Sequence, residues 1–109
     1  MPQRISHYLK QERRRSGLTQ ADVAALLGLM SHSNVKGYER GRHLPSLRTA
    51  LSYQAIFGKP VAELFGGVFA GIMEAVAVRA KTRQAHVSTL AESARTLRRK
   101  RSLRQITTS

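Results

Sequence analysis

The 109-residue sequence contains no cysteine and no tryptophan. The lack of cysteine excludes disulfide bonds, thiolate ligands for a metal ion and a cysteine nucleophile. Proteins without disulfides are typical of a reducing compartment, so we expect a cytoplasmic location. A chain of this length is expected to form one domain with an appendage.

Acidic residues are scarce, with six Asp and Glu against 19 Lys and Arg, which gives a formal net charge of +13. Six scattered carboxylates form no nucleophile–base–acid set, so we expect no enzyme and no catalytic residue. The basic excess is self-repulsive in a folded chain, which favours a polyanionic partner. Nucleic acid is the first candidate, and an anionic membrane surface is the second.

Long apolar runs, a secretion signal and metal-ligand spacing are also missing. The most apolar run, Leu64–Met73, lies between two glutamates and is too short to cross a bilayer. We therefore expect no membrane insertion. The four histidines are widely scattered, so we expect no metal and no cofactor. They are His7, His32, His43 and His86.

The periodicity of the chain is helical throughout, so we expect an all-α fold. Five short helices are expected in the first 66 residues, which we take as one domain. Residues 67–100 and the basic tail 101–109 follow as separate segments. The expected helices are Ile5–Arg15, Gln20–Leu27, His32–Arg40, Leu47–Phe57, and a short helix that starts at Pro60 and ends near Phe65.

Capping residues separate these helices. Thr19 and Asp22 have the spacing of a capping box, and Ser31 and Ser46 are the expected N-caps of the next two helices. Helical spacing then assigns the buried faces. Apolar inner positions are expected at Tyr8, Leu9, Val23, Ala24, Leu26, Leu27, Val35, Tyr38, Leu47, Ala50 and Leu51.

Residues 68–100 contain neither Pro nor Gly after Gly71, which predicts one long helix. Apolar residues recur at alternating spacings of four and three, with Arg83 as the one charged exception. This seam admits three interpretations: a dimerisation helix, a structural helix that is partly solvated, or a membrane-surface helix. The candidate dimerisation residues are Phe69, Met73, Val76, Val87, Leu90 and Leu97. Residues 107–109 are expected to be disordered.

Two motifs that follow each other in the chain give it a family resemblance. They are GLTQxxxAxxLG, which starts at Gly17, and YERGRxLPSL, which starts at Tyr38. They resemble the lambda-repressor-like (XRE) helix-turn-helix family. The resemblance covers about residues 5–65. It implies a five-helix domain whose third helix enters the major groove of DNA while the second lies across the backbone. Between Gly28 and Val35 this chain has one residue more than the commonest family spacing, which we place in a longer turn at 29–31.

The resemblance also implies roles for individual residues. The positions that read bases in the family correspond to His32, Ser33, Lys36 and Gly37. The positions that contact phosphates correspond to Gln20, Arg40, Arg42 and His43. Arg13 and Glu39 correspond to an ion pair that joins the first helix to the end of the third.

The function implied is a sequence-specific transcriptional regulator, a repressor that binds a palindromic operator on double-stranded DNA as a homodimer. An antitoxin that neutralises a partner toxin and regulates its own operon is the alternative, because antitoxins share this domain. A ligand-sensing role is not expected, because one helix and a tail after Phe65 form no pocket.

Overall fold

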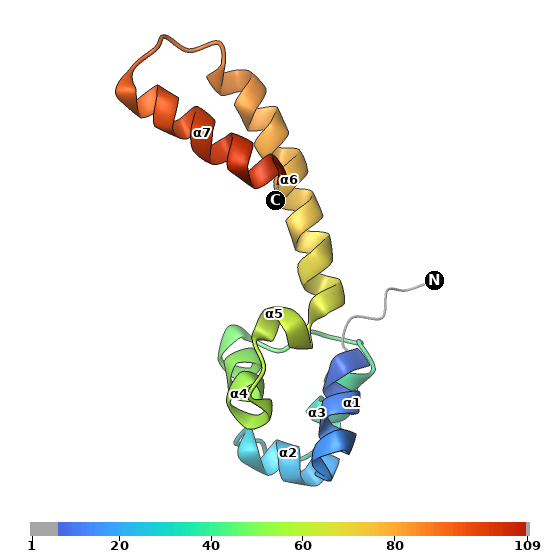
Figure 1. Cartoon of the computed structure of the whole chain (residues 1–109). Coiled ribbons are helices and arrows are strands. Elements are labelled where there is room, and N and C mark those ends of the chain that lie inside the picture. The colour runs from blue at the N-terminus through green and yellow to red at the C-terminus, as the bar shows by residue number, and fades with distance from the viewer. Residues whose placement is uncertain (1–6, 109) are drawn as a thin grey trace. The chain divides into compact units, whose positions relative to one another are not determined.

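The computed structural model describes residues 7–108, and every regular element within them is a helix (Figure 1). The expected all-α class is therefore confirmed. The helices are α1 (His7–Ser16), α2 (Gln20–Leu26), α3 (Ser33–Glu39), α4 (Leu47–Phe57), α5 (Val61–Leu64), α6 (Gly66–Val87) and α7 (Ala94–Thr108).

The chain divides into two units, which we call the head domain (Met1–Phe69) and the hairpin (Ala70–Ser109). In the head domain α1 packs against α3, α4 and α5, and α2 packs against α3 and α4. Nine buried residues, which lie on α1 to α5 or directly after α5, form one core. They are Leu9, Val23, Ala24, Val35, Tyr38, Ala50, Tyr53, Leu64 and Phe65.

Tyr53 lies at the centre of this core and is 1% exposed. Its ring stacks on Phe57 and meets Tyr38 and Phe65 edge-on, at centroid distances of 6.0, 6.3 and 6.2 Å. These offset and T-shaped geometries are the favourable ones for aromatic pairs. Burial raises the pKa of the Tyr53 phenol.

The inner face of α4 differs from the expected one. Leu47 is 73% exposed and Leu51 is 49% exposed, whereas Ala50 and Tyr53 are buried. The inner stripe of α4 therefore follows Ala50, Tyr53 and Phe57 at helical spacing, because the large Tyr53 ring fills the core. The assignment of Leu26 to the inner face of α2 is also wrong, since that side chain is 60% exposed.

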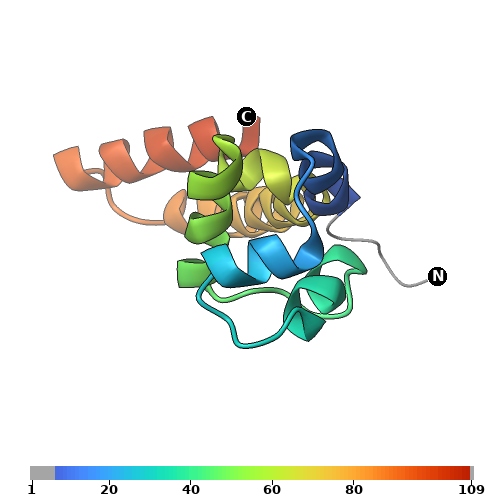
Figure 2. The same cartoon turned by 90° about the horizontal axis from the view of Figure 1, so that it is seen from below.

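The ends of α2 follow the sequence signals. The backbone N–H of Asp22 donates to the Thr19 hydroxyl at 3.0 Å, and the N–H of Thr19 donates to the Asp22 carboxylate at 2.9 Å. The capping box is therefore complete, and these hydrogen bonds lower the pKa of Asp22. At the other end, the turn from Gly28 to His32, where the sequence resemblance places the extra residue, leaves Met30 fully exposed. Figure 2 shows this turn bulging away from α2 and α3.

Helix α3 begins at Ser33, one residue later than expected. His32 occupies the N-cap position and makes no capping hydrogen bond through its side chain, so the prediction of Ser31 as the N-cap is wrong. Ser46 does cap α4, as expected. Pro60 precedes α5 as its N-cap, instead of opening the helix. Ile5, which the sequence pattern placed on the first helix, lies outside the described residues.

The single long helix expected over residues 68–100 is wrong, because α6 ends at Val87 and α7 begins at Ala94. The hydroxyls of Ser88 and Thr89 donate to carbonyls of the last turn of α6, both at 2.7 Å. The Ser93 hydroxyl accepts from the N–H of Thr96 at 3.1 Å and so caps α7. These local hydrogen bonds compete with a continuous helix.

The two helices of the hairpin run alongside each other (Figure 1). Ala80, Val87 and Thr96 are its buried residues. Helix α7 continues to Thr108, so residues 101–108 form the end of a helix instead of a disordered tail.

Candidate nucleic-acid interface

The outward face of α3 is polar and carries no acidic side chain. Ser33, Lys36 and Arg40 are exposed and lie on the same side of the helix. His32 is exposed immediately before them. Asn34 is exposed beside Ser33 and was missed in the sequence, although an Asn amide can form a bidentate pair with the edge of adenine. This face can therefore offer hydrogen bonds to base edges.

Gly37 belongs to the same outward face but is buried, contrary to the open space expected there. A Cβ atom built on Gly37 would collide with the imidazole of His43. The His43 ring packs edge-on against Tyr38 with 4.8 Å between ring centroids, and the side chain as a whole stays exposed. His43 therefore occupies the place where a side chain at position 37 would project.

The turn after α3 brings His43 to this position. Gly41 has a φ of 72°, a left-handed conformation that glycine adopts without strain. The N–H of Gly41 donates to the carbonyl of Tyr38 at 3.1 Å, and the N–H of Arg42 donates to that of Gly37 at 3.0 Å. These two bonds form a Schellman motif, which reverses the chain so that the next residue lies over the last turn of the helix.

Arg13 and Glu39 form the expected ion pair between α1 and α3. The Arg13 Nε donates to one carboxylate oxygen at 2.6 Å and its Nη2 to the other at 3.1 Å, while Nη1 donates to the carbonyl of Leu18 at 3.1 Å. The side chains are only 13% and 3% exposed. The hydrogen bonds to Glu39 raise the pKa of Arg13, which keeps its charge committed to this pair.

Gln20 is part of the same network. Its side-chain nitrogen donates to the Glu39 carboxylate at 3.2 Å, and the side chain is half-buried. One of its two amide hydrogens is thus used within the protein. The second remains for an outside acceptor.

A hollow of about 550 Å³ lies beside Gln20. It is bordered by α1, by the start of α2 and by His32 just before α3. The basic side chains of Lys10 and Arg14 line it and are exposed, and no ion pair joins either to an acid in residues 7–108.

Arg40 and Arg42 are exposed at the end of α3. Within the described residues neither has an ion-pair partner. The cations at the two ends of α3 are therefore available to an anionic partner, in contrast to Arg13.

The candidate dimerisation residues do not form one continuous seam. Val87 is fully buried inside the hairpin and offers no surface to a partner, and Leu90 lies in the connection between α6 and α7. Phe69, Met73 and Val76 are 44%, 44% and 40% exposed on α6. Leu97 is 48% exposed on α7, a separate helix.

The described part of the chain lacks two other kinds of site. No group of three or more His, Asp or Glu side chains there is arranged to hold a metal ion. None of its helices combines the length and the apolar character that crossing a bilayer requires.

Residues 4–64 match the family described as a helix-turn-helix domain, of the lambda-repressor-like kind. This match covers more than half of the chain and coincides with α1 to α5. No curated protein and no solved structure is significantly similar to the chain.

Proposed function

This chain belongs to the helix-turn-helix domain family, whose members are DNA-binding regulators, and we propose that it is a sequence-specific repressor that reads duplex DNA through α3. The observation that carries the proposal is the acid-free outward face of α3, flanked by cations that have no ion-pair partner within residues 7–108. In this arrangement phosphate contacts supply affinity and base contacts supply selectivity. The family match points to a DNA-binding regulator, a class of protein that is usually non-enzymatic.

Base reading is proposed for His32, Ser33, Lys36 and His43. A lysine at the centre of the face suits the acceptor edge of guanine, and a serine or histidine can donate or accept. His43 replaces Gly37 in this role, because its imidazole covers the backbone of Gly37. The sequence resemblance had assigned His43 to phosphates.

Phosphate contacts are proposed on both sides of α3. Arg40 and Arg42 are proposed to contact phosphates beside the C-terminal end of α3. Lys10, Arg14 and the free amide hydrogen of Gln20 serve the hollow beside α2. Each lysine or arginine that neutralises a phosphate steepens the dependence of binding on salt by about 0.9 in the log–log slope.

Two copies are proposed to bind a palindromic operator, with half-sites about one helical turn apart. The exposed apolar side chains Ile72, Met73 and Val76 on α6 provide a surface for the second copy. A different protein, such as a toxin, would use the same surface, so the composition of the purified complex separates the two candidates. Occupation of a promoter by such a dimer blocks transcription without a further domain.

Selection of bound duplexes from random DNA tests this function. The full-length protein is expected to enrich a motif with inverted symmetry. Lys36→Ala is expected to alter the motif, whereas Arg48→Ala on α4 serves as a control of equal charge change and is expected to leave it unchanged. Recovery of all sequences at equal frequency would refute sequence-specific binding.

A further inference from the structure

The hairpin is the most basic part of the molecule. Residues 70–109 contain nine of the 19 Lys and Arg residues and two of the six acids, a net charge of +7. Six of these basic residues lie between Arg95 and Arg104, all of them on α7. Such a concentration of like charge opposes folding of the hairpin unless an anion offsets it.

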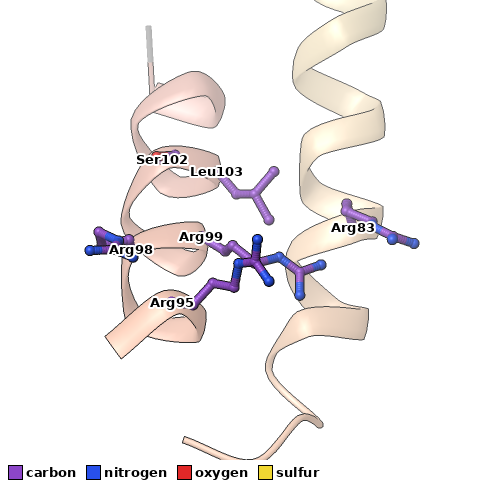
Figure 3. A pocket seen from close by; sticks show the side chains of 6 residues that line it. All are labelled: Arg83, Arg95, Arg98, Arg99, Ser102 and Leu103. Atoms are coloured by element: carbon purple, nitrogen blue, oxygen red, sulfur yellow. The ribbon is translucent and has the colours of Figure 1, made fainter. Parts of the chain in front are cut away.

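Four arginines border one hollow between α6 and α7, with a volume of about 430 Å³. Arg83 comes from α6, and Arg95, Arg98 and Arg99 come from the first turns of α7. Figure 3 shows Arg95, Arg99 and Leu103 pointing from α7 toward α6, whereas the side chain of Arg98 points away from α6 and that of Arg83 points away from α7. A hollow of this size is within the range of small-molecule sites.

None of the four arginines is paired with an acid in the described residues. The hairpin has two glutamates, and Glu92 is already bonded to Lys100 at 2.9 Å. The other, Glu74, lies nine residues before Arg83 on the same helix, or about 13 Å along its axis. Unlike Arg13 in the head domain, these arginines have no structural carboxylate to neutralise.

We propose that this hollow is a second anion site, which binds a group of two or more closely spaced phosphates. Arg95 and Arg99 lie one turn apart, about 6 Å along α7, so their guanidinium forks can take neighbouring phosphates. Guanidinium is the side chain best matched to phosphate oxygens, because it donates two parallel hydrogen bonds. The hollow itself was not expected from the sequence, where one helix and a tail offered no pocket.

Two sources provide this chemistry: a free oligophosphate, such as the phosphate chain of a nucleotide, and successive phosphates of a DNA strand. Titration calorimetry of the full-length protein with inorganic tripolyphosphate tests the first source. Arg95→Gln with Arg99→Gln is expected to weaken binding at least tenfold, because the variant loses the charge-assisted hydrogen bonds of two guanidinium groups.

Matched variants distinguish binding in the hollow from non-specific attraction of an anion to the positive charge of the protein. Lys81→Gln with Arg101→Gln removes the same charge from the hairpin outside the hollow and is expected to change the affinity for tripolyphosphate less than about threefold. Arg95→Lys with Arg99→Lys keeps the charge and loses the fork, so its affinity is expected to fall between the wild type and the Gln variant. Circular dichroism checks that α7 stays helical.

Titration with duplex DNA tests whether the hollow binds successive phosphates of a DNA strand. If the hollow takes DNA phosphates, the Arg95→Gln, Arg99→Gln variant lowers the salt slope of binding by about two and leaves the selected motif unchanged. An unchanged motif separates this result from a failure of base reading by α3. The proposal is overturned if this variant equals the Lys81, Arg101 control for both tripolyphosphate and DNA.

Discussion

At the scale of single residues, Gly37 and His43 act as one unit on the surface of α3. Because a Cβ at position 37 collides only with the flexible imidazole, Gly37→Ala should displace His43 without unfolding the domain. Alanine in a helix interior gains up to about 1 kcal/mol over glycine. We therefore predict unchanged or higher stability together with an altered base preference, measured against single-base variants of the selected site.

His43→Ala should alter preference at the same base pair as Gly37→Ala, since both remove the imidazole from its place. The control is Arg48→Ala, a substitution on the exposed surface of α4. If Gly37→Ala and His43→Ala both keep the wild-type preference, His43 does not read a base.

Arg13 is a structural residue despite its place in a basic helix. Arg13→Ala leaves Glu39 buried without its partner, and breaking a buried pair costs about 3–5 kcal/mol. Urea unfolding should show a loss of that order. Arg15→Ala breaks an exposed pair with Glu12 and should cost less than about 1 kcal/mol. Equal losses for the two variants would contradict the structural role of Arg13.

The sequence pattern predicts the position of a side chain correctly where a single interaction determines that position. Val35 and Tyr38 face the core as their spacing indicates, and the Arg13–Glu39 pair is present. The patterns are weaker where several neighbours compete. The burial of Gly37 depends on a side chain six residues later, and the buried stripe of α4 depends on how the Tyr53 ring packs in three dimensions.

At the scale of elements, the capping box makes α2 sensitive to pH. Asp22 has a folded-state pKa below its ordinary value of 3.8 because it accepts the hydrogen bond from the Thr19 N–H. Its ionised form therefore stabilises the fold above that pH, and this contribution is lost as the pH falls through the lower folded-state value. Asp22→Ala should lower the thermal midpoint at pH 7.

The difference in thermal midpoint between wild type and Asp22→Ala should shrink as the pH falls below 3.8. Asp22→Asn keeps an acceptor for the Thr19 N–H and should retain part of the stability at pH 7. A difference that is the same at pH 7 and at pH 2 would contradict an ionised cap.

Helix ends were predictable where a strong cap stands alone, as at Thr19 and Ser46. The break between α6 and α7 was missed because the heptad spacing continues through it. Ser88, Thr89 and Ser93 carried the contrary signal, since their hydroxyls bond to the backbone at the two helix ends. When a helix end is predicted from the sequence, capping residues should therefore be given more weight than an apolar heptad repeat that contains a small residue such as Ala80 or a charged one such as Arg83.

At the scale of the whole molecule, dimerisation through α6 is open to a direct test. Val76→Asp places a charge among exposed apolar side chains and should weaken self-association at least tenfold, or about 1.4 kcal/mol. Val78→Asp lies on the opposite side of the helix, is 60% exposed, and is the matched control. Sedimentation should be measured at tens of micromolar, free and on the selected duplex. A wild-type monomer in both conditions would exclude the dimer.

The central claim, that the head domain meets DNA through the outward face of α3, is tested most directly by amide chemical shifts of the full-length protein during titration with the selected duplex. The largest changes are predicted in Ser33–Glu39, in residues 40–43 and around the hollow of Lys10 and Arg14. Shifts confined to α7, or absent from α3, would contradict the claim.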